Sequence, residues 1–268
     1  MIELKVNGSK VELKSWKFPA GEVGVQIPQI QKHSKVDVIL TMPSSDEIFI
    51  CLNILNALHK QELDHHNIHL HIPYVPYGRQ DRVCHDGESH ALEVFTKVIL
   101  KAYPYFSTLH IKDPHSQVTV DLFTEWQSTL VVETQRQCAM YLPKFDALIA
   151  PDKGAADKVK THYQVDALNV PYFTILKERK DGKVNYIDFP YDTIKGNVCV
   201  VDDICDGGAT FLSLAEMLVR TQPNMKILNL YVTHGIFSKG LDELDKFYDT
   251  IYVHNNMNQS VADSVTVI

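Results

Sequence analysis

Short apolar runs alternate with amphipathic segments along most of the chain. Runs with the length of buried strands occur at residues 36–42, 68–72, 108–111, 147–150, 166–170, 173–176, 198–201, 227–232 and 250–253. Between them, residues 48–59, 91–101 and 212–220 carry apolar side chains at helical spacing. Strands that alternate with helices predict an α/β protein with mostly parallel sheets, because crossover helices cover the sheet faces.

The first residues show a different pattern, in which apolar and polar positions alternate on both sides of Asn7-Gly8. The two alternating segments are residues 2–6 and 11–13. Because Asn-Gly is a strong signal for a tight turn between antiparallel strands, this region predicts a β-hairpin.

A boundary between two domains is expected near residues 130–145. Residues 133–142 have the pattern of a helix that opens the second half, and Pro143 would end it. We therefore divide the chain into domains 1–135 and 136–268. The second domain would close with a strand at residues 264–268.

The most informative segment is residues 197–210, which combines a buried strand, an acidic pair and a glycine turn. Asp202 and Asp203 follow the apolar run, and residues 206–210 (Asp-Gly-Gly-Ala-Thr) lead into a helix from Phe211. Such a turn offers backbone N–H groups and a helix N-terminus to an anion, while the carboxylates accept hydrogen bonds from vicinal hydroxyls. The pattern favours a ribose 5-phosphate unit as ligand over an ordinary α/β turn without ligand.

Composition narrows the classes of partner. The chain has 268 residues and a net charge of −7 without any long basic tract, so nucleic acid is not an expected partner. Its five cysteines are odd in number and show no Cys-x-x-Cys spacing, which favours a reduced, cytoplasmic protein over a disulfide framework or a structural zinc site. No leader or long apolar stretch indicates a membrane partner. We expect solvent or core roles, rather than a metal cluster, for His65, His66, His69 and His71.

Six further segments occur in an order typical of one enzyme family. They are residues 18–22 (Phe-Pro-Ala-Gly-Glu), 73–82 (Pro-Tyr-Val-Pro-Tyr-Gly-Arg-Gln-Asp-Arg), 113–115 (Asp-Pro-His), 150–154 (Ala-Pro-Asp-Lys-Gly), 177–180 (Lys-Glu-Arg-Lys) and 233–238 (Thr-His-Gly-Ile-Phe-Ser). With residues 197–210, they resemble the ribose-phosphate pyrophosphokinases, the phosphoribosyl pyrophosphate synthetases. This resemblance implies two phosphoribosyltransferase-like (type I) domains, the first with ATP-binding loops and the second with a ribose-phosphate-binding loop.

The resemblance also implies the residues that handle the donor. Those that would bind ATP are Phe18, Glu22, Arg79, Gln80, Asp81, Arg82 and His115. His115 and Asp152 would bind Mg²⁺, which takes most of its ligands from phosphates and water. Lys177 and Arg179 would be catalytic residues on a mobile loop that closes over the reaction centre and stabilises developing charge. The plain alternatives are an exposed polar loop for residues 79–82 and a solvated charge run for residues 177–180.

By the same resemblance, the residues that would bind the ribose phosphate are Asp152, Asp202, Asp203, Asp206, Gly207, Gly208, Ala209 and Thr210. Two positions depart from the family pattern. Ala20 replaces an Asn or Asp that reads the base, and Gly207 replaces a Thr whose hydroxyl helps to bind the 5-phosphate. The glycine leaves a roomier loop that would also admit ADP-ribose, the acceptor of a phage-associated group that feeds NAD regeneration. Ribose 5-phosphate and ADP-ribose remain alternative acceptors.

The reaction implied is Mg²⁺-dependent transfer of the β,γ-diphosphoryl group of ATP to the anomeric 1-hydroxyl of a ribose 5-phosphate unit, with release of AMP. The alternatives are a phosphoribosyltransferase and a catalytically inactive regulatory homologue. A homo-oligomer is expected, because loops like the one at Phe18 complete a neighbouring subunit's site in relatives. Relatives also continue into a terminal helix that this sequence lacks, which leaves the oligomer's size open.

Overall fold

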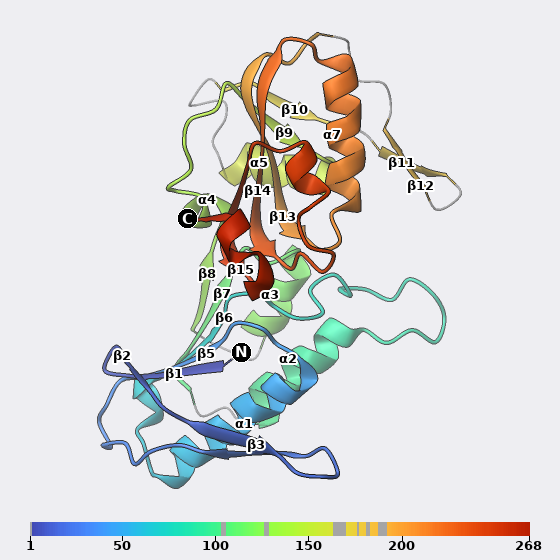
Figure 1. Cartoon of the computed structure of the whole chain (residues 1–268). Coiled ribbons are helices and arrows are strands. Elements are labelled where there is room, and N and C mark those ends of the chain that lie inside the picture. The colour runs from blue at the N-terminus through green and yellow to red at the C-terminus, as the bar shows by residue number, and fades with distance from the viewer. Residues whose placement is uncertain are drawn as a thin grey trace. The chain divides into compact units, whose positions relative to one another are not determined.

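The computed structural model describes residues 2–102, 106–125, 129–162, 170–175, 177–180, 183–186 and 192–268. The chain forms two compact units, Met1–Glu133 (unit 1) and Thr134–Ile268 (unit 2), each with its own six-stranded sheet (Figure 1). The predicted α/β class with mostly parallel sheets is confirmed in both units. Among the described residues, no helix has the length and apolar character needed to cross a membrane.

The sheet of unit 1 has the strand order β2-β1-β5-β6-β7-β8. Its strands are β1 (Ile2–Val6), β2 (Ser9–Val11), β5 (Val36–Leu40), β6 (Ile68–Ile72), β7 (Thr108–Lys112) and β8 (Leu130–Glu133). Strands β5 to β8 are parallel, whereas β1 is antiparallel to both β2 and β5. The predicted N-terminal hairpin is confirmed, with its second strand two residues earlier than expected. Asn7 and Gly8 form its turn with φ of 50° and 82°.

Three helices, α1 (Ser45–Lys60), α2 (Ala91–Ala102) and α3 (Gln117–Thr124), pack on one face of this sheet. They share a face because β5 to β8 follow chain order and parallel crossovers are right-handed. Ser44 caps α1, as its Oγ accepts a hydrogen bond from the N–H of Glu47 at 3.3 Å. The core joins alternate strand residues, such as Val38 and Leu70, to helix residues such as Leu92.

A cluster of polar side chains lies on the other face of the same sheet, which no helix covers in the described part of unit 1. The hydroxyl of Thr108 lies 2.6 Å from Nδ1 of His69 and 3.1 Å from Nε2 of His110. The ring of His71 stacks on that of His110, with centroids 4.4 Å apart, and its Nε2 lies 2.9 Å from Oδ1 of Asp37. Burial lowers the pKa of His69 and of His110, and the neighbouring histidines lower both further.

The four histidines near β6 therefore divide into two pairs. His65 and His66 lie exposed in a short 3-10 helix, His65–Asn67, before the strand. His69 and His71 lie half-buried within it.

The sheet of unit 2 has the order β10-β9-β13-β14-β15-β16, and all of its strands are parallel. They are β9 (Ala147–Ala150), β10 (Tyr172–Thr174), β13 (Gly196–Cys205), β14 (Met225–Gly235), β15 (Thr250–Asn256) and β16 (Thr266–Val267). Helix α7 (Ala209–Thr221) covers one face, where Phe211 and Leu214 pack on Val200. Helix α5 (Lys153–His162) covers the other, where Val159 packs on Val201. Burial of both faces explains the unbroken apolar run at 198–201. Two 3-10 helices, Leu244–Lys246 and Gln259–Ser264, complete the unit.

Three sequence predictions in this unit need correction. Residues 133–142 do not form one helix: Glu133 ends β8, where it pairs with Lys112, and α4 (Gln135–Cys138) begins after a capping box at Thr134. Strand β13 extends beyond 201 because its pairing with β14 continues to Cys205. Helix α7 begins at Ala209, two residues before Phe211, since Gly208 at φ 77° turns the chain directly into it.

Of the strand predicted at 166–170, residues 166–169 lie outside the described residues, and Val170 belongs to no strand. The strand predicted at 173–176 is β10, and residue 176 is likewise outside the description. The predicted C-terminal strand is present as the short β16.

We expect the histidine cluster to make unit 1 less stable in mild acid. The folded-state pKa values of His69 and His110 lie below the ordinary value of 6.5, so below that pH the unfolded chain binds more protons and stability falls. Both tryptophans of the chain, Trp16 and Trp126, belong to residues 1–133, so their fluorescence reports urea unfolding of this unit. We expect a lower urea midpoint at about pH 5.5 than at about pH 7.5, on either side of the ordinary pKa of histidine.

His110→Gln should reduce this loss, because it removes one of the groups that protonation penalises. His65→Gln, in the exposed pair before β6, should leave the loss unchanged. The same pH dependence in the wild type and in His110→Gln would contradict the assignment.

Candidate functional site

Two sequence-predicted segments of unit 1 meet at the carboxyl ends of β6 and β7. The N–H of Lys112 donates to the carbonyl of Pro73 at 3.2 Å, which ties the end of β7 to the start of the 73–82 loop. A Cβ built on Gly78 would lie 3.6 Å from the Cβ of His115. Asp113 is buried with φ of 36°, and its N–H donates to the carbonyl of Glu133 at 2.7 Å. The structure thus places the arginine loop and the Asp-Pro-His segment side by side.

The backbone of the 73–82 loop is held in place while its polar side chains are exposed. Tyr77 has φ of 61°, and its carbonyl accepts a hydrogen bond from the N–H of Gln80 at 2.8 Å. Arg79 and Gln80 are exposed. Arg82 is exposed too, and its Nε lies 3.8 Å from Oδ1 of Asp81, an ion pair that contributes little to stability. The loop therefore offers cations and an amide to a ligand.

Phe18 and Glu22 lie at the end of a hairpin formed by β3 (Lys14–Lys17) and β4 (Val23–Gln26). The N–H of Phe18 donates to the carbonyl of Glu22 at 2.7 Å, and that of Gly21 to the carbonyl of Phe18 at 2.9 Å. Phe18 is 49% exposed and Trp16 44%, with their rings edge to face at 6.0 Å. A turn bearing two exposed aromatic rings is suited to contact a planar group or another protein surface.

In unit 2, the predicted phosphate loop lies between β13 and α7. The side chain of Ser238 donates from Oγ to Oδ1 of Asp206 at 2.6 Å, and the N–H of Ser238 to the carbonyl of Asp206 at 3.2 Å. Gly208 has φ of 77° and is the N-cap of α7, so the N–H groups of Ala209 and Thr210 begin the helix. The start of an α-helix carries a positive potential, which makes this turn suitable for an anion.

Three carboxylates gather at the same edge of this sheet. Asp152 follows β9, and its Oδ1 accepts a hydrogen bond from the N–H of Ala155 in the first turn of α5, at 3.0 Å. Asp202 and Asp203 lie in the last part of β13. Burial raises the pKa of Asp202 well above its usual range, and the negative charges of Asp203 and Asp152 raise it further. Asp203 is 5% exposed, and Lys158 of α5 lies 3.0 Å from its Oδ2.

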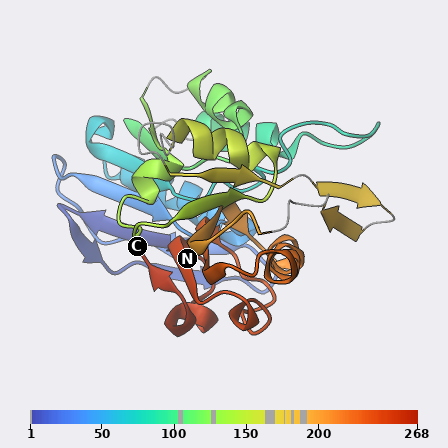
Figure 2. The same cartoon turned by 90° about the horizontal axis from the view of Figure 1, so that it is seen from above.

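Lys177 and Arg179 lie in a β-hairpin rather than in an irregular loop. Strand β11 (Lys177–Lys180) pairs antiparallel with β12 (Lys183–Tyr186), with Lys177 opposite Tyr186. Figure 2 shows the two arrows standing away from the sheet of unit 2. The sequence places Asp181-Gly182 between the strands, a dipeptide typical of hairpins.

Sequence reasoning missed three residues at the unit 2 site. Lys158 carries the cation beside Asp203, and Ser238 fixes Asp206. The aliphatic part of Lys239 lies against the turn, since its Cδ would be 3.4 Å from a Cβ on Gly207. Ser238 closes one of the segments that carry the family resemblance, so that segment held a usable signal. No comparable motif pointed to Lys158.

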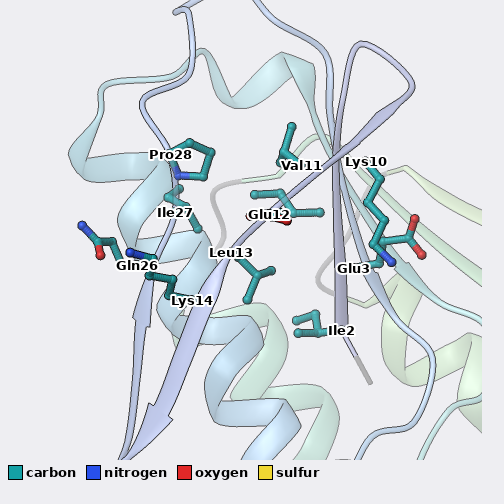
Figure 3. Close-up of a pocket in the computed structure, with 11 residues that line it drawn as sticks. Ile2, Glu3, Lys10, Val11, Glu12, Leu13, Lys14, Gln26, Ile27 and Pro28 are labelled. Carbon is teal, nitrogen blue, oxygen red and sulfur yellow. The ribbon is translucent and has the colours of Figure 1, made fainter.

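Unit 1 also has two cavities, one away from the polar loops and one lined in part by Tyr77 of the arginine loop. The first, of about 690 Å³, lies between the N-terminal hairpin and residues 12–14 and 26–28 (Figure 3). Its charged lining is balanced, with Glu3 and Glu12 against Lys10 and Lys14, so it has no charge excess for a polyphosphate. The second, of about 420 Å³, is an apolar groove between α1 and α2 that includes Phe49, next to Tyr77 of the arginine loop.

Several named proteins are similar to this chain over most of its length. No family model matches the chain. The protein from Pyrococcus furiosus named ribose-phosphate pyrophosphokinase is 27% identical over 264 residues, which cover 97% of this chain and 91% of the relative. A protein of the same name from Thermococcus kodakarensis is 28% identical over 268 residues, with the same two coverages.

A solved structure, the phosphoribosylpyrophosphate synthetase from Mycobacterium smegmatis, matches with a TM-score of 0.74 and 19% identity. The match covers 96% of this chain and 85% of that chain. This likeness confirms the predicted fold of two phosphoribosyltransferase-type α/β domains. The relatives aligned over nearly the whole chain support the ribose-phosphate pyrophosphokinase family.

Proposed function

We propose that the chain is a Mg²⁺-dependent pyrophosphokinase that transfers the β,γ-diphosphoryl group of ATP to the anomeric 1-hydroxyl of a ribose 5-phosphate unit and releases AMP. The observation that carries the proposal is the turn at 206–210, at the N-terminus of α7 and beside the carboxylates of Asp202 and Asp203. A sugar phosphate has both groups that such a site binds, an anion and vicinal hydroxyls. Relatives named ribose-phosphate pyrophosphokinase extend over both domains and support the donor half of the reaction.

Diphosphoryl transfer depends on positioning and charge neutralisation rather than on covalent help from the protein. In the proposed mechanism, residues 1–135 bind ATP and residues 136–268 bind the sugar. Arg79 binds the terminal phosphates of ATP, and Gln80 lies near its base. Asp203 accepts hydrogen bonds from ribose hydroxyls, while the backbone N–H groups of residues 207–210 hold the 5-phosphate.

The residues present fit a magnesium ion. The negative charge of Asp152 raises the pKa of Asp202, and a cation beside these carboxylates would relieve that repulsion. Carboxylate oxygens are ligands of the kind that Mg²⁺ prefers. When bound, the ion would neutralise the phosphates of the donor. Asp152 and His115 are the residues that we expect to hold it.

The two alternatives account for fewer features. A phosphoribosyltransferase that consumes a pyrophosphorylated sugar does not need a nucleotide site such as the one proposed for residues 18–22 and 79–82. An inactive regulatory homologue has no need to retain the cations and metal ligands, whereas Arg79, His115, Asp152, Lys177 and Arg179 are all present. The pyrophosphokinase is therefore the function that the site supports best.

Two acceptors remain compatible with the phosphate loop. Gly207 contributes no side chain, and its nearest neighbour is the flexible Lys239, so the turn has room beside it. A terminal phosphate, as in ribose 5-phosphate, would bind there through backbone N–H groups. A phosphate esterified on its far side, as in ADP-ribose, would also fit, which is the basis for proposing the ADP-ribose pyrophosphate reaction of NAD synthesis as the second candidate.

We further infer a cytoplasmic homo-oligomer. All five cysteines are free thiols, four of them buried, which supports a reducing compartment. Trp16 and Phe18 on the β3–β4 hairpin, and the apolar groove beside Tyr77, expose apolar surface that a second copy of the chain would cover.

The reaction is tested by incubating the protein and Mg²⁺ with ATP and either ribose 5-phosphate or ADP-ribose, with mass spectrometry of the products. We expect AMP and a 1-pyrophosphorylated sugar in equal amounts, with no product when EDTA is added. AMP release without a ribosyl acceptor, or no product with either acceptor, would reject the proposed reaction.

Gly207→Thr tests the role of the roomy loop in the choice of acceptor. The position does not require a positive φ, and the added side chain would meet only Lys239. The new hydroxyl donates to a terminal phosphate and fills the space that ADP-ribose would need, so kcat/KM for ribose 5-phosphate relative to ADP-ribose should rise about tenfold. Gly207→Ala, which adds bulk without a hydroxyl, is the matched control. An unchanged ratio in both variants would show that the loop does not select the acceptor.

Lys177→Ala tests the proposed catalytic hairpin. A cation that stabilises charge only in the transition state contributes to turnover, so kcat should fall about 100-fold or more while KM for ATP changes little. Lys180→Ala, in the same strand, should retain kcat near the wild-type value. Comparable effects of the two substitutions would remove the specific role given to Lys177.

A further inference from the structure

A buried ion pair links helix α5 to the end of β13 in unit 2. Nζ of Lys158 lies 3.0 Å from Oδ2 of Asp203, and the side chains are 17% and 7% exposed. The two residues are far apart in sequence, so the contact depends on the packing of α5 against the sheet. Val159, the next residue of the helix, is fully buried on Val201 and fixes the position of this turn of α5.

The surroundings of the pair are strongly acidic. Asp202 lies next to Asp203, and Oδ1 of Asp202 accepts a hydrogen bond from the N–H of Asp203 at 2.9 Å. Asp152, at the start of α5, adds a third carboxylate that acts on Asp202. Each carboxylate in such a group raises the energy of ionising the others, and a cation in contact with one of them offsets that cost. Lys158 is the cation in contact with Asp203.

The carboxylates also differ in the group that each one contacts. Asp152 accepts a backbone N–H of α5, and Asp203 contacts an ammonium group. The ammonium group of Lys158 repels a second cation from the oxygen of Asp203 that it contacts. Asp203 is therefore better suited to accept hydrogen bonds from hydroxyl groups than to bind a divalent metal.

We propose that Lys158 is a positioning residue for the sugar, one that holds the carboxylate of Asp203 in the orientation that accepts hydrogen bonds from the ribose hydroxyls of the acceptor. The inference rests on the proposed function, because it takes the ribose to bind at Asp203. Lys158 acts through Asp203 and contacts neither the acceptor nor ATP. Its loss should therefore affect acceptor binding and leave nucleotide binding unchanged.

A purely structural ion pair predicts a different result. Removing one member of a buried pair leaves the other charge unpaired and destabilises the fold. The loss of stability would then affect the whole enzyme, and KM for ATP would change together with KM for the acceptor. The two roles are separated by comparing the two substrates and not by activity alone.

The experiment measures kcat, both KM values and the melting temperature for Lys158→Met, Lys158→Arg and Lys160→Met, with whichever acceptor the wild type uses. We expect Lys158→Met to raise KM for the acceptor about tenfold or more, as for a weakened hydrogen bond to a charged group, with KM for ATP within about twofold. Lys158→Arg should restore most of the acceptor affinity because it keeps the cation. Lys160→Met, on the exposed side of the same helix, should behave as the wild type.

A second comparison avoids the unpaired charge, in case Lys158→Met folds poorly. Asp203→Asn and the double variant Lys158→Met/Asp203→Asn both lack an ionised Asp203. If Lys158 acts through Asp203, the double variant should have the same KM for the acceptor as Asp203→Asn alone. A further loss in the double variant, or equal changes in KM for both substrates in Lys158→Met, would overturn the inference. A wild type that makes no product with any ribosyl acceptor would instead reject the proposed function.

Discussion

Parallel pairing of β9, β13 and β14 is the constraint on which the candidate sugar site depends. It brings the carboxyl ends of these strands to one edge of the sheet, where Asp152 follows β9 and Asp202 lies near the end of β13. The N-termini of α5 and α7 begin at the same edge, so their backbone N–H groups face the same region. The edge therefore combines repulsion between carboxylates with a positive potential from two helices. Such a mixture suits a ligand with an anionic phosphate, neutral hydroxyls and an accompanying metal ion.

In the sheet of unit 1, the carboxyl ends of parallel strands also meet at one edge, but they bring different side chains together. The carboxyl ends of β6 and β7 bring the arginine loop beside His115, and backbone hydrogen bonds hold the loop while the side chains of Arg79, Gln80 and Arg82 are exposed. Gly78 lies beside His115, where an added Cβ would be in ordinary van der Waals contact with the histidine Cβ at 3.6 Å. Since all three helices pack on one face of the sheet, the other face keeps its histidine cluster in contact with polar groups. The cluster lies within the strands and not at the edge that carries the loops.

Much of this arrangement could be predicted from local sequence patterns. The strand-turn-helix at 197–210, the hairpin around Asn7-Gly8 and the cap at Ser44 are short-range features, in which neighbouring residues determine the geometry. The extension of β13 to Cys205 could not be predicted, because it depends on pairing with β14. The helix expected at 133–142 was wrong for a related reason: Glu133 pairs with Lys112, a residue distant in sequence. Lys158 belongs to no recognisable sequence motif, and its contact with Asp203 depends on how α5 packs against the sheet.

The two glycines of the phosphate loop are under different constraints, and this difference bears on how acceptor specificity can change. Gly208 has φ of 77°, and a Cβ there would lie 3.2 Å from Leu244, so a side chain would strain both the backbone and the core. Gly207 has no such φ, and a Cβ there would meet only the flexible Lys239 at 3.4 Å. One position therefore maintains the turn and the start of α7, while the other can change without altering them. Variation at residue 207 changes the chemistry next to the bound phosphate and leaves the carboxylates of Asp202 and Asp203 in place. A change of acceptor consequently requires no change in the parts of the chain proposed to bind ATP.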